Sequence, residues 1–155
     1  MYGAGPERDL QQLAAPLARA VVDSLENSHT AWFAAASSYA SLASLESIEQ
    51  AERARFEAEI LNHIAYLADA LHGARPELFV EHATSIHTSQ VRRRAPVTRV
   101  EQTLLALRAT LAAPPAGLCV TPELAAQAAL LLDAAVEAIR RQTRPPPRNT
   151  GAPGR

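Results

Sequence analysis

Glu59 and His63 are the two residues whose types and spacing are best suited to binding chemistry. They lie four positions apart in a stretch without Gly or Pro. On a helix they share one stripe with four apolar residues, Phe56, Ile60, Leu67 and Ala70. Such a stripe faces the interior, where a polar group is costly unless it is paired or meets a polar ligand. Two interpretations stay open: a polar pair inside a ligand groove, or an ordinary i,i+4 pair at the helix margin.

Two further histidines, His82 and His87, lie five positions apart on the next expected helix. A helix separates them by about 140°, so they do not form a metal-ligand pair. His63 and either of them would lie on two facing helices, which is the arrangement of axial ligands in a haem globin. Haem is therefore a candidate cofactor, ranked second to a ligand that the family resemblance implies.

Arg92–Arg94 could bind ligand carboxylates, but a solvated basic helix end is the favoured interpretation. The single Cys119 excludes an internal disulfide and suits a small loop hydrophobe. No nucleophile elbow, zinc-binding helix or phosphate-binding Gly-rich loop occurs, so we expect no enzyme.

Composition favours one all-α domain in a chain of 155 residues that is rich in Ala and Leu. A net charge of −1 argues against a dedicated nucleic-acid binder, yet residues 1–88 carry a net charge of −7 and residues 89–155 a net charge of +6. No secretory signal and no membrane span is recognisable, so a cytoplasmic protein is expected.

The elements that position these residues are about six helices. We expect a flexible arm over 1–6, a single domain over 7–142 and a disordered Pro- and Arg-rich tail over 143–155. Pro16 should kink or break the first helix. The first helix is expected over about 7–26, and the second carries Trp32, Phe33, Tyr39, Leu42 and Leu45. A long central helix over 47–72 follows, and the last three are expected over 76–93, 98–112 and 122–142. Periodicity leaves a bundle and a globin-like sandwich equally open.

Local signals mark the ends of these helices. Capping-box spacing occurs at Ser47–Gln50 and Thr98–Glu101, and Thr121 precedes Pro122 as an N-cap. Gly73 is expected to take the left-handed conformation after the long helix.

A family resemblance rests on the order of four short motifs. Ile-Ala-Tyr-Leu-Ala-Asp-Ala-Leu (64–71) precedes a Gly-containing turn, followed by Ala-Pro-Val (95–97), Gly-Leu-Cys-Val (117–120) and Leu-Asp-Ala-Ala-Val-Glu-Ala-Ile (132–139). Over residues 50–142 this order resembles the phycobiliproteins, globin-fold proteins that hold linear tetrapyrroles. It is closer to their non-haem bacterial relatives, the photoglobins, which occur beside or fused to cobalamin-binding sensor domains.

The resemblance implies a globin-like helical sandwich with a bilin between the third and fourth helices. The family's bilin-attachment Cys falls on or near Phe56 and its pyrrole-binding Asp on Glu59, so a bilin there would be held non-covalently. Cys119 approximately matches a second attachment position. Leu78-Phe79-Val80-Glu81 resembles a photoglobin stretch, but His82 and Ser85 replace the Tyr and Trp that often follow, which changes the pocket.

The predicted function is a non-enzymatic sensory domain that binds a biliverdin-like tetrapyrrole and signals, as a photoreceptor would, to a homodimer partner or to a cobalamin-binding or signalling protein. The predicted binding residues are Phe56, Glu59, Ile60, His63, Tyr66, Leu67, Phe79, His82 and Ile86. The alternatives are a ligand-free helical interaction or dimerisation protein and a divergent haem globin. Neither a membrane nor a nucleic acid is an expected partner.

Overall fold

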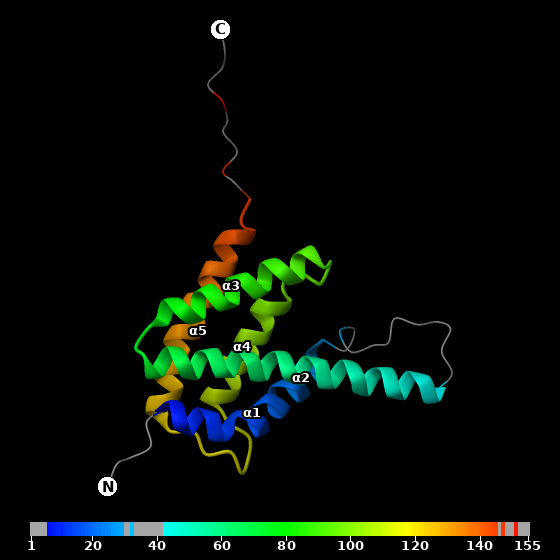
Figure 1. Ribbon diagram of the computed structural model, residues 1–155, viewed down its shortest axis with the longest axis horizontal. Helices are drawn as coiled ribbons and strands as arrows, with labels where there is room; N and C mark the ends of the chain where they lie inside the picture. Colours follow the sequence, from blue (N-terminus) through cyan, green and yellow to red (C-terminus); the bar gives the residue numbers. More distant parts are fainter. Residues whose placement is uncertain (1–5, 30–31, 33–41, 146, 148–150, 152–155) are drawn as a thin grey trace.

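The computed structural model describes residues 6–29, 32, 42–145, 147 and 151, and within them the protein is all-helical (Figure 1). The described residues contain five helices: α1 Pro6–Ser28, α2 Leu42–His72, α3 Pro76–Arg92, α4 Arg99–Ala112 and α5 Pro122–Thr143. The all-α prediction is thus confirmed for this part of the chain, which holds five of the about six predicted helices. None of these helices is long and apolar enough to cross a membrane in the part of the chain that is described.

The helices form two crossing groups. α1, α2 and α3 lie side by side, and α4 and α5 cross behind them (Figure 1). α5 packs against both α3 and α4, while α1 also packs against α4. The N-terminal part of α2, drawn in cyan, extends past the ends of the other helices. The seam between α2 and α3 carries most of the residues predicted to bind a ligand.

The core is built by the inward stripes that the sequence periodicity predicts. Leu17 and Val21 of α1, Leu104 of α4 and Leu132 of α5 are completely buried. The remaining predicted inward residues of α1, α4 and α5 that are also buried are Leu10, Leu25, Val100, Leu107, Leu111, Leu124, Ala128, Ala135 and Ile139. Residues repeating every three or four positions therefore meet at one interior, as expected for packed amphipathic helices.

Two predicted features of the N-terminal half differ in the structure. α2 begins at Leu42 instead of Ser47, so Ser47 is a helical residue and no capping box starts the helix there. The Leu-Ala-Ser-Leu-Glu run before Ser47 contains no helix breaker, so the helix continues through it. Most of the predicted second helix, with Phe33 and Tyr39, lies outside the described residues, as does most of the predicted tail.

α1 continues through Pro16 as one element, so the predicted break does not occur. A proline inside a helix removes one backbone hydrogen bond, and the helix persists when packing offsets that loss. Leu17 and Ala18, directly after the proline, are completely buried and supply such packing.

The turn between α2 and α3 places the left-handed residue one position later than predicted. Ala74, not Gly73, has a positive φ of 50°. The Arg75 backbone N–H donates to Ala70 O at 2.9 Å, which closes the end of α2. Gly73 donates to Asp69 O within the last helical turn. The sequence signal marked the correct turn, but helical bonding extends through the glycine.

The two remaining predicted caps have opposite outcomes. Thr121 Oγ1 accepts a hydrogen bond from the Leu124 N–H at 3.2 Å, which confirms the N-cap of α5. Thr98 makes no side-chain cap because its backbone is already helical, with φ −88° and ψ −1°. The preceding turn, in which the Arg99 N–H donates to Pro96 O, leads directly into α4.

Leu132 and Leu130 offer a matched test of the core. Leu132→Ala should lower the free energy of unfolding by about 2–5 kcal/mol because its side chain is completely buried. Leu130→Ala, on the same helix but 71% exposed, should change it by less than about 0.5 kcal/mol. Urea denaturation followed by circular dichroism measures both values, and equal losses would contradict this core.

Ala74 supplies a second stability prediction. Replacing it by Gly should raise the free energy of unfolding by about 0.5–1 kcal/mol, because a Cβ is unfavourable at φ 50°. Gly73 is the matched control. Its φ is not positive, so Gly73→Ala cannot raise the free energy of unfolding by relieving a left-handed backbone. Thermal and urea denaturation of both variants check the one-residue shift, and a stability loss in Ala74→Gly would contradict it.

Candidate functional site

A buried pair of histidines joins α2 to α3. His63 Nδ1 and His82 Nε2 are 3.0 Å apart, and both side chains are buried, with 2% and 8% of their residue surface exposed. One of these two nitrogens must carry a proton and donate it, and the other must be unprotonated and accept. Two fully protonated rings would place donor against donor, and hence the pair carries at most one proton charge.

Burial keeps this pair neutral. Removal from water, together with the nearby His82, lowers the pKa of His63 from its usual 6.5 to about 3. Burial also lowers the pKa of His82. At neutral pH each ring therefore combines one N–H donor with one acceptor nitrogen, which suits recognition of a mixed donor–acceptor ligand.

Aromatic rings enclose the open side of His82. The Tyr66 ring stacks on it with centroids 3.9 Å apart and planes within 9°. Phe79, completely buried one turn earlier on α3, lies with its centroid 6.2 Å from that of His82. Tyr66 is 44% exposed, so it forms the boundary between the histidine pair and solvent.

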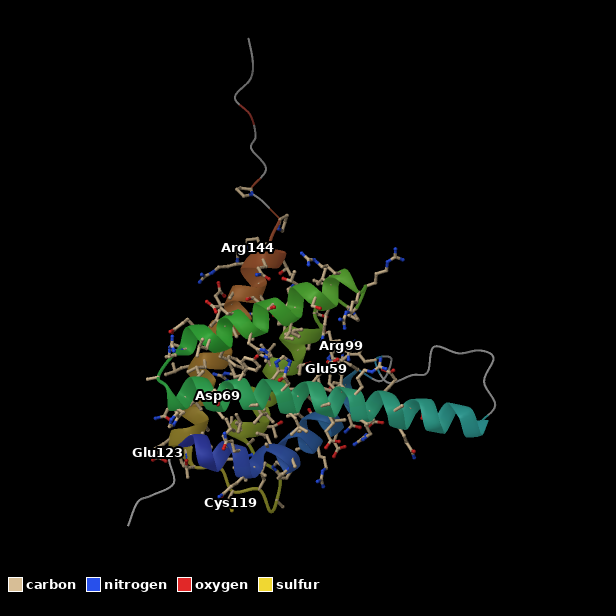
Figure 2. All side chains as sticks on the ribbon, in the orientation of Figure 1. Glu59, Asp69, Arg99, Cys119, Glu123 and Arg144 are labelled. Carbon is tan, nitrogen blue, oxygen red and sulfur yellow. The ribbon has the colours of Figure 1, made fainter. Side chains whose placement is uncertain are left out.

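Glu59 lies one helical turn before His63 on α2 and takes partners from two other helices. Its Oε2 accepts from Gln90 Nε2 of α3 at 3.2 Å and from Arg99 Nη2 of α4 at 3.4 Å. Figure 2 shows Glu59 and Arg99 close to one another at this junction. The predicted Glu59–His63 pair is thus replaced by two separate contacts, because each side chain reaches a partner on a facing helix.

Phe56 lies one helical turn before Glu59 on α2 and contacts the same arginine, Arg99. The Arg99 guanidinium carbon lies 4.6 Å from the centroid of the Phe56 ring, within the range of a cation–π contact. Phe56 also packs against Trp32, which stacks on His29. The structure therefore uses Trp32 in core packing around Phe56, and it links α2 to α4 through Arg99.

The nine predicted binding residues separate into two groups. Phe56, Ile60, Leu67 and Phe79 belong to the closed hydrophobic core, together with the buried His63–His82 pair. Three residues form a partly exposed edge of the seam, Tyr66, Ile86 and Glu59, whose side chain is 32% exposed. We call Glu59, His63, Tyr66, His82 and Ile86 the α2–α3 seam.

Sequence reasoning missed Gln90 and Arg99. Each contacts Glu59 although 31 and 40 residues, respectively, separate them from it in the chain. Arg99 lies near the start of the predicted helix over 98–112, and no local pattern marks either residue. Only the packing of α3 and α4 against α2 reveals them.

Three surface cavities lie away from the nine predicted residues. One of about 660 Å³ lies between α1, α4 and the loop before α5, and one of about 520 Å³ lies between α3 and the end of α5. Arg92 and Arg93 line the second, outside the α2–α3 seam. A third, of about 430 Å³, is lined by His87, Arg92 and Val97.

Cys119 is a free, exposed thiol in the loop between α4 and α5. It lies at the end of the molecule opposite Arg144 (Figure 2). The thiol does not belong to the α2–α3 seam.

The histidine geometry bears on a haem site. An iron bound by two imidazoles at about 2 Å from each nitrogen would separate those nitrogens by about 4 Å. His63 and His82 are instead in direct hydrogen-bond contact at 3.0 Å. His87 is buried elsewhere, on the face of α3 that lines the third cavity. Among the described residues, no group of three or more His, Cys, Asp or Glu side chains could hold a metal ion.

No family model matches this sequence, and comparisons with curated proteins and with solved structures find no significant match. The site is therefore interpreted from its own geometry.

The depressed pKa of His63 predicts acid sensitivity. The unfolded chain binds a proton at His63 below about pH 6.5, whereas the folded chain does so only near pH 3. Stability contributed by this group is thus fully present above pH 6.5 and falls below it by about 1.4 kcal/mol per pH unit. Urea denaturation at pH 7.5, 6.0 and 5.0 measures this slope.

His63→Met should reduce that slope, since it removes the titrating ring. Leu132→Ala serves as the control: it is also destabilised but keeps His63, so it should retain the slope of the unsubstituted protein. Identical pH slopes in all three proteins would contradict a neutral buried His63.

Proposed function

We propose that this chain is a non-enzymatic sensory domain of the phycobiliprotein and photoglobin type, with globin-like helix packing, that binds a linear tetrapyrrole non-covalently along the α2–α3 seam. The observation that carries the proposal is the line of polar groups set among core side chains where α2 meets α3. Glu59, His63 and His82 lie within this line, and Tyr66 covers its open edge.

The chemistry of the seam complements a bilin. Pyrrole N–H groups need acceptors, which the Glu59 carboxylate provides, while lactam oxygens need donors, which a neutral imidazole provides. From Glu59 to Tyr66, α2 advances seven residues, or about 10 Å. This span suits an extended planar molecule rather than an ion. Phe56 offers a ring and no thiol, so the proposed attachment is non-covalent.

Burial defines how such a ligand would enter. Phe56, Ile60, Leu67 and Phe79 are packed in the core, so the ligand would lie along the partly exposed edge formed by Tyr66, Ile86 and Glu59. Stacking of Tyr66 on His82 at 3.9 Å presents an aromatic surface at that edge. Ligand binding that displaces this ring would alter the contact of α2 with α3 and signal to a partner, either a second copy or a cobalamin-binding or signalling protein.

A second candidate function is a ligand-free interaction or dimerisation module. Two observations favour it: the closed core packing of Phe56, Ile60, Leu67 and Phe79, and the exposure of Tyr66 and Leu130. A haem globin is less well supported, because His63 and His82 bond directly to each other.

Biliverdin titration of the purified chain tests the proposal. The expected result is a red-shifted, structured absorbance band. Tyr66→Ala and Glu59→Gln should each weaken binding about tenfold, since the first removes the stacking ring and the second replaces a charged acceptor by a neutral amide. Leu130→Ala, an exposed apolar change on α5, is the matched control and should bind like the unsubstituted protein.

The other outcomes separate the alternatives. A Soret band with added haem, lost in His63→Ala, would favour the globin function and contradict the bilin proposal. A colourless protein in both titrations would reject tetrapyrrole binding. Sedimentation over a concentration range would then decide whether the chain associates with itself through its helical surface.

A further inference from the structure

Two buried polar atoms beside Glu59 have no hydrogen-bond partner. They are Gln90 Oε1 and Arg99 Nε, both shielded from solvent. A third such atom among the described residues, Arg108 Nε, still faces Asp133 Oδ1 at 2.7 Å in an ion pair. The two atoms near Glu59 are therefore the ones whose hydrogen-bonding capacity is left over, and native proteins rarely bury such atoms without a water or ligand to meet them.

The two atoms are chemically complementary. Gln90 Oε1 can only accept a hydrogen bond, and Arg99 Nε–H can only donate one. The other ends of the same two groups, Gln90 Nε2 and Arg99 Nη2, are bound to one oxygen, Glu59 Oε2, at 3.2 and 3.4 Å. Because both groups bind the same Glu59 oxygen, their unused atoms, one acceptor and one donor, lie at the same junction of α2, α3 and α4.

The surroundings add an apolar support and a route of entry. The Arg99 guanidinium is fixed over the Phe56 ring, with its carbon 4.6 Å from the ring centroid. The Arg99 and Glu59 side chains are 19% and 32% exposed, so this junction reaches the surface.

From this arrangement we propose that Gln90 and Arg99 form a subsite for a cis-amide, the group found in a lactam ring. Its N–H would donate to Gln90 Oε1 and its carbonyl oxygen would accept from Arg99 Nε–H, while the contact with Phe56 holds the guanidinium in place. The inference deepens the proposed function and rests on it for the natural ligand, in which this subsite would hold a terminal lactam ring of the tetrapyrrole. The Glu59 carboxylate between the two groups would then face the adjacent pyrrole N–H.

A small lactam tests the subsite without the tetrapyrrole. The ¹⁵N-labelled full-length chain is titrated with 2-pyrrolidinone, and Arg Nε–H resonances are assigned by their loss in Arg99→Lys and Arg108→Lys. The expected result is a saturable shift of the Arg99 Nε–H signal, with no shift for Arg108. N-Methylpyrrolidinone, which lacks the N–H, should bind about tenfold more weakly. No shift at Arg99 would show that the lactam does not bind there, and equal shifts at both arginines would show a non-specific effect; either result would overturn the subsite.

Biliverdin then separates failure of the subsite from failure of the function. Gln90→Met and Arg99→Lys should each weaken biliverdin binding about tenfold, whereas Arg108→Lys on the α4–α5 face should not. Biliverdin binding that is unchanged in the first two variants would overturn the subsite and leave the sensory function standing. A lactam shift in a chain that binds no biliverdin would support the subsite and reject the tetrapyrrole.

Discussion

The burial of two neutral imidazoles between α2 and α3 is the constraint on which the rest of this site depends. His63 and His82 can share one hydrogen bond only while the pair holds at most one charge, and burial holds the pKa of His63 near 3. This bond fixes which faces of the two helices meet. It thereby sets the register that brings Glu59 to Gln90 and stacks Tyr66 on His82. An apolar pair would fill the same space without this directional requirement.

Neutral and charged polar groups occupy different positions along α2 at the seam. The inner part holds neutral rings, and the outer part, at Glu59, holds a full carboxylate facing a guanidinium. The Arg99–Glu59 ion pair is partly buried and joins α4 to α2, whereas Arg53 joins the exposed sides of α1 and α2 through Asp23 and Glu26. The Arg99–Glu59 ion pair is part of the candidate site. The ion pairs of Arg53 lie on the surface, where such pairs contribute little to stability.

Sequence periodicity predicted the all-α class, the inward stripes and the approximate extent of four helices, because burial repeats every three or four residues. It also selected Glu59, His63 and His82 as polar groups on inward faces. It failed where the outcome depends on distant partners: Gln90 and Arg99 lie beside Glu59 only after three helices pack. It failed as well at Ser47, Thr98 and Gly73, where continued helical bonding displaced a locally favourable cap.

The N-terminal part of α2 gives the long helix the geometry of a lever arm. Arg53 is its ion-pair tie to α1, and residues 42–52 precede that tie over about 16 Å of helix. Of residues 49–52, none is buried. Leu42 lies 17 residues, or about 25 Å of helix, from Glu59, so a rotation of α2 by about 10° about Glu59 would displace this end by roughly 4 Å. Under the proposed sensory function, a small change in helix orientation at the seam would therefore become a larger change in position at the far end of α2.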